Sequence, residues 1–372
     1  MKLKIFSLTT IFLFSILICG CLAQAEDNSQ NSAQVNEKVD PVEEILNSMT
    51  LAEKIGQMVL VGVHGKEIND DIKFILNQYH YGGIILFDRN MENQAQVKKF
   101  VDELQVAANQ KLPLFIALDE EGGRVARMKH DLQVMPSQQE IGNSGDISQA
   151  YDCAKTTAQN LRKIGVNINF APVADVGNDT RDFSNDPQIT TDFVSSAAKG
   201  YDSEKFFYCL KHFPGIGKSK IDPHKDISDI EDDIDTLAAE ELPPFQKVIN
   251  EHDNSKFMVM IGHLKYTAID DQNPASISSA IITRILRDKL GFTGVVITDD
   301  LEMGATKDYH ENIGVKAIKA GVDIALVCHE YDKQEKVYLG ILEAVKSGEI
   351  SEERINESVR RILKMKLQLA DF

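Results

Sequence analysis

The 372-residue chain has few cysteines and a deficit of positive charge, and each shortage excludes a class of protein. Only Cys153, Cys209 and Cys328 lie in the body of the chain, and their spacing fits no zinc site. We therefore expect no required disulfide and no bound metal. Forty basic residues against 57 acidic ones give a formal net charge of -17. Because such a surface repels phosphate backbones, nucleic-acid binding is not expected.

The chain also lacks an apolar run at its start that is long enough for a stable membrane span. The run from Ile5 to Ile18 follows two lysines and closes with Cys19-Gly20-Cys21, which is typical of a signal peptide. Its end resembles the lipobox of bacterial lipoproteins, which implies that residues 1–20 are removed and that Cys21 carries a lipid. An ordinary secretory signal cut a few residues later is the alternative. Both predict export.

Residues 21–40 are rich in Asn, Gln, Ser and Glu, and they predict a flexible linker to one domain at 41–372. In that domain, short apolar runs without alternation are typical of strands covered on both faces. The predicted strands are Met58–Val63, Gly83–Phe87, Leu114–Leu118, Asn167–Pro172, Phe206–Lys211, Phe257–Gly262, Gly294–Thr298 and Asp323–Cys328. The predicted helices include Asn93–Asn109, Ser148–Ile164, Asp235–Asn250, Ser278–Leu290, Asn312–Ala320, Lys333–Ser347 and Ser351–Leu369.

Eight strand–helix units match the size and rhythm of a single (β/α)8 TIM barrel, an α/β fold. A doubly wound open sheet is the competing architecture. The polar residues favour the barrel, because five strands place ionisable groups at their carboxyl ends, where barrel enzymes build their sites. These groups are Asp119, Asp175, the pair Lys211-His212, His263 and Asp299.

Several motifs, in this order along the chain, resemble those of the glycoside hydrolase family 3 β-N-acetylhexosaminidases of bacteria. They are Asp119-Glu120-Glu121-Gly122-Gly123-Arg124-Val125-Ala126-Arg127, Phe170-Ala171-Pro172-Val173-Ala174-Asp175, Arg181-Asp182-Phe183-Ser184-Asn185-Asp186-Pro187, the segment from Lys211-His212-Phe213-Pro214-Gly215 to Asp222-Pro223-His224, and Thr298-Asp299-Asp300-Leu301-Glu302-Met303. Ile216, Lys218 and Asp182 depart from the family pattern, which puts the fine substrate preference in doubt.

The resemblance implies that Asp299 is the nucleophile and that His224, oriented by Asp222, is the acid/base. It further implies that Asp119, Arg127, Arg181, Lys211 and His212 hold an N-acetylglucosamine ring, and we expect Asp175 and His263 to line the same pocket. No cofactor is implied.

Other polar residues have simpler interpretations. Asp300 is expected to pair with a neighbouring lysine or arginine, and His263 is as easily a structural hydrogen-bonding group. Glu121 is assigned to loop architecture, since adjacent residues such as Glu120 and Glu121 point apart. His329 has no motif around it and is expected on a loop or surface.

The predicted function is an exported, lipid-anchored β-N-acetylglucosaminidase that faces the outside of the cytoplasm and trims peptidoglycan-derived glycans or muropeptides with retention of configuration. A β-glucosidase or a GlcNAc phosphorylase of the same family is an alternative, and so is an inactive lipoprotein that binds wall glycans.

Overall fold

The computed structural model describes residues 40–371, apart from residues 130, 218, 220–227 and 310. The predicted signal peptide, Cys21 and the linker lie outside the described residues. Asp222 and His224 lie outside them as well.

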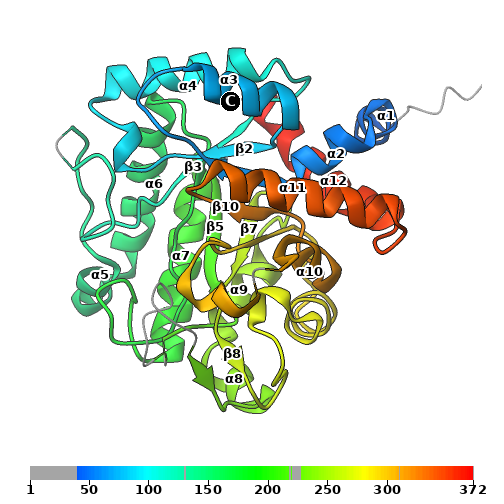
Figure 1. Cartoon of the computed structure of the whole chain (residues 1–372). Coiled ribbons are helices and arrows are strands. Elements are labelled where there is room, and N and C mark those ends of the chain that lie inside the picture. Colours follow the sequence, from blue (N-terminus) through cyan, green and yellow to red (C-terminus); the bar gives the residue numbers. More distant parts are fainter. Residues whose placement is uncertain (1–39, 130, 218, 220–227, 310, 372) are drawn as a thin grey trace, which may run out of the picture. The chain divides into compact units, whose positions relative to one another are not determined.

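The central sheet has eight strands, and all of its paired strands are parallel (Figure 1). Its order is β10-β1-β2-β3-β4-β5-β7-β9, and a parallel bridge between Ile297 and Ile324 joins the two ends of this order. The ring is thus nearly closed, and the predicted barrel is confirmed. The strands are β1 (Val59–Gly62), β2 (Gly83–Ile85), β3 (Phe115–Leu118), β4 (Ile168–Asn169), β5 (Phe207–Phe213), β7 (Phe257–Ile261), β9 (Val295–Thr298) and β10 (Ala325–Val327).

Every residue of these strands is buried, which explains why the sequence shows apolar runs without alternation. All eight predicted runs coincide with a strand, although β5 continues two residues beyond its run, to Phe213. Cys209 lies in β5 and Cys328 directly after β10, and both are buried as expected. A small separate sheet pairs β6 (Asp229–Ile230) with β8 (Lys265–Tyr266).

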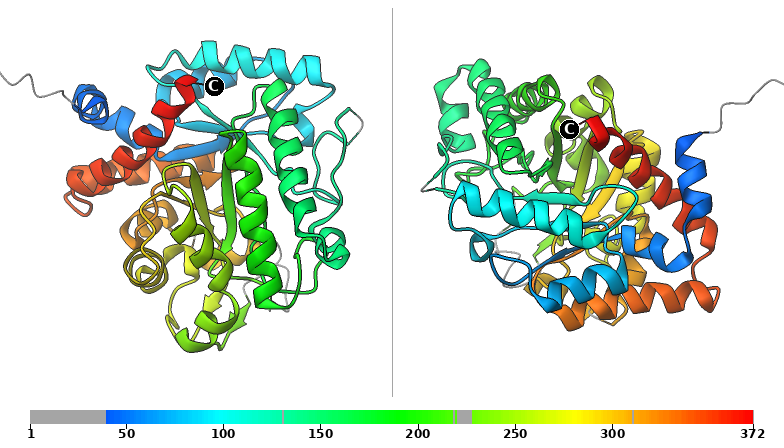
Figure 2. Two further views of the ribbon diagram at one scale, coloured as in Figure 1. Left: turned by 180° about the vertical axis from the view of Figure 1, so that it is seen from behind. Right: turned by 90° about the horizontal axis from the view of Figure 1, so that it is seen from above.

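Helices surround the sheet (Figure 2). They are α1 (Pro41–Ser48), α2 (Leu51–Gln57), α3 (Asp70–Tyr79), α4 (Gln94–Ala108), α5 (Gln138–Ser144), α6 (Ile147–Lys163), α7 (Pro187–Ser203), α8 (Ile234–Glu240), α9 (Pro243–Glu251), α10 (Ile313–Ala320), α11 (Tyr331–Lys346) and α12 (Glu352–Leu367), with the π-helix η3 (Ala280–Lys289) and the short 3-10 helices η1 (Asp88–Asn90), η2 (Ala275–Ile277), η4 (Gly304–Tyr309) and η5 (Gln368–Asp371). In the described part of the chain, none is both long and apolar enough to span a bilayer.

One helix prediction needs correction. The single helix expected at Asp235–Asn250 is two helices, α8 and α9, because Pro243 cannot continue α8 but is well suited to the first turn of α9. The long helix α7 follows the fourth strand, as the eight strand–helix units require, although its serines, threonines and glycine are weak helix formers. Packing against α6 and α9 stabilises it nonetheless.

Asp323, just before β10, connects the strands to the outer helices. Its Oδ2 accepts hydrogen bonds from the backbone N of Val296 at 2.9 Å and from Arg287 at 2.6 Å, and its Oδ1 accepts from Ser358 at 2.5 Å and Arg361 at 2.9 Å. Burial raises the pKa of this carboxyl, but the two arginines outweigh burial and keep it below its ordinary value. A buried anion thereby holds η3 and α12 against the barrel.

Candidate active site

A cavity of about 250 Å³ lies at the carboxyl ends of the barrel strands. Residues from the loops after β2, β3, β4, β9 and β10 contribute to its wall, together with residues of β5 and β7. Its lining consists of Ile85, Phe87, Asp119, Glu121, Arg124, Val125, Arg127, Phe170, Arg181, Lys211, His212, Met260, Asp299, Asp300, Met303, Leu326, Cys328 and His329. Six residues predicted for the site, namely Asp119, Arg127, Arg181, Lys211, His212 and Asp299, are therefore brought together at this end of the barrel.

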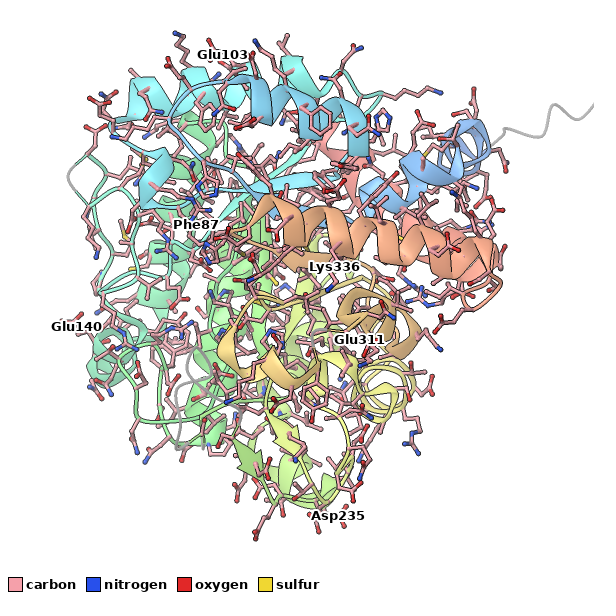
Figure 3. The ribbon with its side chains drawn as sticks, in the orientation of Figure 1. Phe87, Glu103, Glu140, Asp235, Glu311 and Lys336 are labelled. Carbon is pink, nitrogen blue, oxygen red and sulfur yellow. The ribbon has the colours of Figure 1, made fainter. Side chains whose placement is uncertain are left out.

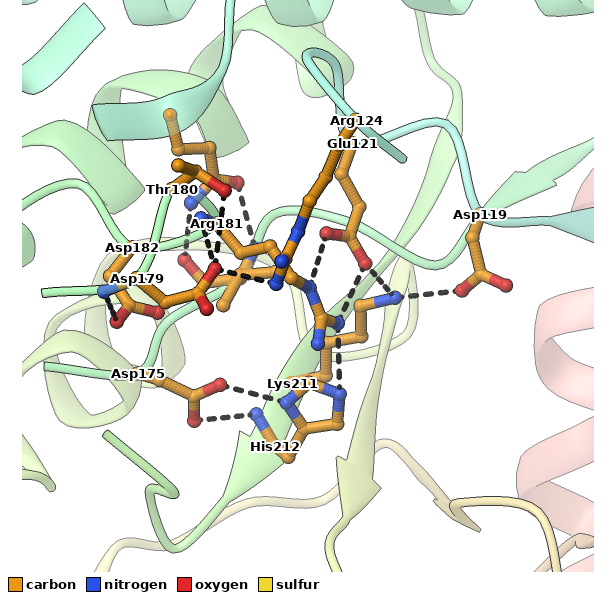
Figure 4. Close-up of polar contacts among 12 residues, drawn as sticks. Asp119, Glu121, Arg124, Asp175, Asp179, Thr180, Arg181, Asp182, Lys211 and His212 are labelled. Carbon is orange, nitrogen blue, oxygen red and sulfur yellow. Dashed lines mark hydrogen bonds and ion pairs between the residues drawn. The ribbon is translucent and has the colours of Figure 1, made fainter. Parts of the chain in front are cut away.

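Three cations and two carboxylates form the charged wall of this cavity. Lys211 Nζ lies 2.7 Å from Asp119 Oδ1 and 2.6 Å from Glu121 Oε1 (Figure 4). Arg127 pairs with Asp119 at 2.9 Å, and Arg181 pairs with Glu121 at 2.8 Å. Each cation is held in one position by a carboxylate, so its remaining N–H groups are arranged in advance to bind hydroxyl groups.

The ion pairs also determine the charge states of this wall. Burial raises the pKa of Glu121, but Lys211 and Arg181 outweigh burial and bring it to about 2. Burial also raises the pKa of Asp119, but Lys211 and Arg127 outweigh burial and hold it well below its ordinary value. Burial lowers the pKa of Lys211, yet Asp119 and Glu121 keep it above its ordinary value. All three groups are therefore ionised at neutral pH.

His212 is oriented by Asp175, which stands behind it. Asp175 accepts hydrogen bonds from the backbone N of His212 at 3.0 Å and from its Nδ1 at 2.8 Å (Figure 4). Nε2 is then left on the cavity side, 3.4 Å from a guanidinium nitrogen of Arg181 and 4.0 Å from Asp299 Oδ2.

Lys211 and His212 are neighbours in β5, yet both side chains face the cavity. In a regular strand they would point to opposite faces. The register between β5 and β7 shifts between Leu210 and Phe213, and the Lys211–His212 peptide bond is cis. This irregular strand end presents two consecutive polar side chains to the same site.

Asp299 follows β9 and faces His212 across the cavity. Its Oδ1 accepts a hydrogen bond from the backbone N of Asp300 at 2.8 Å, while Oδ2 is the oxygen nearest to His212. Burial raises the pKa of Asp299, but His212, His263 and the Asp300 amide together hold it below its ordinary value. The side chain is therefore an anion at neutral pH, the state in which a carboxylate can act as a nucleophile.

Asp175 and His263 do not line the cavity, contrary to expectation. Both oxygens of Asp175 are occupied by His212, and Oδ1 also accepts from the backbone N of Ile216 at 3.0 Å. His263 is buried, with Nδ1 2.8 Å from Ser276 Oγ and Nε2 2.9 Å from the carbonyl oxygen of Asp300. Their hydrogen bonds to the protein make both residues supports for the residues in front of them.

Two interpretations of neighbouring residues also need correction, and one needs an addition. Glu121 is part of the cavity wall and not only of the loop. His329 lies on the loop after β10, as expected, and it also lines the cavity. Asp300 contacts no lysine or arginine among the described ion pairs; its Oδ2 lies 3.4 Å from His329 Nε2. The signal for His329 was present in the sequence, since it directly follows the eighth predicted strand.

The loop that leads toward Asp222 and His224 is packed tightly against the loop after β4. An added Cβ at Gly217 would lie 1.9 Å from the carbonyl oxygen of Val176 and 3.0 Å from the backbone N of Gly177. Only glycine permits this backbone crossing. The positions of Asp222 and His224 themselves lie outside the described residues, so their convergence with Asp299 stays a prediction.

Comparison with known proteins identifies the family. The chain is similar to a β-N-acetylglucosaminidase of glycoside hydrolase family 3 from Paenibacillus sp. str. FPU-7, with a TM-score of 0.83 and 36% identity over 87% of this chain and 63% of that one. It is 35% identical to a β-hexosaminidase of Stenotrophomonas maltophilia K279a, over 73% of this chain and 83% of that enzyme.

A β-hexosaminidase A of Pseudoalteromonas piscicida is 31% identical over 80% of this chain, which spans about half (55%) of that enzyme. The family model that describes the N-terminal domain of glycosyl hydrolase family 3 matches residues 50–365, nearly the whole described barrel. The chain therefore belongs to glycosyl hydrolase family 3.

Proposed function

We propose that the protein is a β-N-acetylglucosaminidase that releases terminal N-acetylglucosamine with retention of configuration. The observation that carries the proposal is the ionised Asp299 carboxylate facing a cavity whose charged wall can bind sugar hydroxyls. Relatives named as β-hexosaminidases and β-N-acetylglucosaminidases support the choice of sugar.

In the proposed reaction, Asp299 attacks the anomeric carbon as the bond to the leaving oxygen breaks. A side chain of the protein that acts as the acid transfers its proton to that oxygen. Water, deprotonated by the same group, then attacks the glycosyl-enzyme and releases the sugar with its original configuration.

The proton donor is assigned to His224, with Asp222 orienting its ring. The charge states in the cavity support this assignment, because Asp119 and Glu121 are ion-paired carboxylates with lowered pKa values. Such groups hold no proton to donate at neutral pH. An imidazole titrates in the required range without special burial.

The substrate class proposed is N-acetylglucosamine-terminated wall glycans or muropeptides. The proposed location is a membrane, where a lipid on Cys21 anchors the protein so that it faces the outside of the cytoplasm, in the periplasm or the extracellular space. The proposal of a lipid anchor rests on the lipobox-like residues before Cys21. Radiolabelled fatty acid should be incorporated into the wild-type protein and not into Cys21→Ser. Equal labelling of the two would contradict the anchor.

The activity is tested with the purified full-length protein on GlcNAc-β-1,4-MurNAc and on nitrophenyl glycosides of N-acetylglucosamine and glucose. We expect preference for the N-acetylglucosaminides, the β-anomer as first product, and loss of turnover by about a thousandfold or more in Asp299→Asn, because the covalent step is removed. A preference for the glucoside would refute the substrate, and GlcNAc-1-phosphate formed with added phosphate would indicate phosphorolysis. Binding of the disaccharide without turnover would refute catalysis.

A further inference from the structure

Two aromatic rings lie together in the cavity wall, and the guanidinium carbon of Arg127, a member of the charged wall, lies 5.4 Å from the centre of one of them, Phe87. Phe87 follows β2 and His329 follows β10, and Figure 3 labels Phe87 near these strands. The ring centres are 5.4 Å apart and the ring planes are inclined by 32°. Both rings line the cavity, so they offer a shallow aromatic surface to whatever enters it.

Arg89 fixes both rings in place. Its guanidinium carbon lies 4.5 Å from the centre of the Phe87 ring, and one terminal nitrogen lies 3.2 Å from His329 Nδ1. Nε donates to the carbonyl oxygen of Val63 at 3.0 Å, and the other terminal nitrogen donates to that of Cys328 at 2.6 Å. One partly buried cation thus joins the loops after β1, β2 and β10, and it holds the two rings in place before any ligand binds.

Both ring nitrogens of His329 contact protein groups, so the face of the ring is the part that can bind a ligand. Because Arg89 only donates, Nδ1 accepts, and Nε2 faces Asp300 Oδ2 at 3.4 Å. Both ring nitrogens are therefore directed at protein groups. An aromatic face next to a second aromatic ring is suited to the C–H groups on one side of a sugar ring.

The depth of the cavity shows which sugar would reach this surface. The Lys211 and Glu121 side chains are 3% and 2% exposed, whereas that of His329 is 46% exposed. The charged wall is thus the deep end and His329 belongs to the rim. A terminal sugar that is bound by the charged wall occupies the deep end, so the sugar joined to it lies toward the rim.

The rim also lies close to the reacting carbon. Asp300 directly follows the proposed nucleophile Asp299, and its side chain contacts His329. The aromatic surface therefore lies next to the residue that would attack the anomeric carbon. The leaving sugar is joined to that carbon through a single oxygen and cannot be far from it.

We propose that Phe87 and His329, braced by Arg89, form the binding site for the leaving-group sugar, which stacks one C–H face on the two rings. This inference rests on the proposed function, because it takes Asp299 as the nucleophile and the deep end as the site of the terminal sugar. It makes Phe87 and His329 specificity-determining residues for a second ring.

The test measures binding by titration calorimetry in an Asp299→Asn background, where no turnover occurs. N-acetylglucosamine and GlcNAc-β-1,4-MurNAc are compared for Phe87→Leu and His329→Ala. We expect each variant to raise the Kd of the disaccharide by about three- to tenfold, the range for a lost aromatic contact. The Kd of the monosaccharide should change less than about twofold. Phe74→Leu, at an exposed phenylalanine of α3, is the matched control and should change neither value.

Equal weakening of both sugars, or no weakening of either, would overturn the proposal. So would a disaccharide that binds no more tightly than the monosaccharide to the unaltered rim. Turnover by the protein with Asp299 intact is measured separately. Absence of turnover together with the expected binding pattern would refute the proposed function and leave the sugar site standing.

Discussion

Lys366, in α12, is a fully buried amine whose removal should stabilise the protein at neutral pH. Its Nζ donates to Gln57 Oε1 at 2.7 Å and lies 5.0 Å from the centre of the Phe115 ring. No carboxylate pairs with it within the described part of the chain. Burial alone lowers the pKa of Lys366 from 10.5 to about 7.

The size of the effect follows from this pKa. The unfolded chain binds a proton that the folded chain releases between pH 10.5 and 7, so folding stability falls as the pH falls through this window. A difference of about 3.5 units costs about 4–5 kcal/mol at pH 7 relative to high pH. In Lys366→Met this cost disappears, but Gln57 Oε1 loses its donor, which costs about 1–3 kcal/mol. We expect a net gain of about 1–4 kcal/mol at pH 7.

At pH 10 the sign should reverse. The amine of the wild-type protein is then neutral in the folded state and keeps its hydrogen bond at little cost. Only the loss of the hydrogen bond remains in Lys366→Met, so the variant should be less stable than the wild type by about 1–3 kcal/mol. Other groups titrate alike in both proteins and cancel in the comparison.

Urea unfolding followed by far-UV circular dichroism measures the difference, since the chain has no tryptophan for a fluorescence probe. Lys364→Met, at an exposed position of the same helix, is the matched control and should shift stability by less than about 0.5 kcal/mol at both pH values. A stability difference between Lys366→Met and wild type that is the same at pH 7 and pH 10 would refute the reasoning.

Two further predictions concern the active-site end of the barrel. Because the pKa of Glu121 falls from 4.5 to about 2 on folding, its charge contributes about 3 kcal/mol of stability above pH 4.5, which is lost as the pH falls toward 2. Glu121→Gln should therefore unfold more easily by about 3 kcal/mol at pH 7 and by much less at pH 3, and a constant difference in urea unfolding would contradict this. Gly217→Ala should cost about 1–3 kcal/mol and most of the activity, since its Cβ would meet Val176. Gly340→Ala is its control, because position 340 has room for a methyl group. Equal stability and activity of the two variants would show that the close backbone approach of Gly217 to Val176 is not needed.

The strands and the charged wall could be predicted because each is a local pattern. Buried strands appear as apolar runs, and Asp119, Lys211 and Asp299 stand where such runs end. α7 has a weaker pattern, because its serines, threonines and glycine are weak helix formers and packing against α6 and α9 stabilises it.

The roles of Glu121, His329 and Lys366 depend on partners that are distant in the chain. Glu121 meets Arg181 and Lys211 only after the barrel forms, and His329 acquires its position from Arg89 and Asp300. A lysine near the end of an amphipathic helix looks solvent-exposed until the helix docks. Three-dimensional contact, and not periodicity, decides the role of each.

The pairing of the first barrel strand with the last has a consequence for synthesis. Val59 of β1 lies opposite Ala325 of β10, so the partner of the earliest strand leaves the ribosome near the end of translation. Until then β1 keeps an open edge that can pair with other chains. Products of premature termination before Ala325 should therefore aggregate and not fold into a smaller barrel.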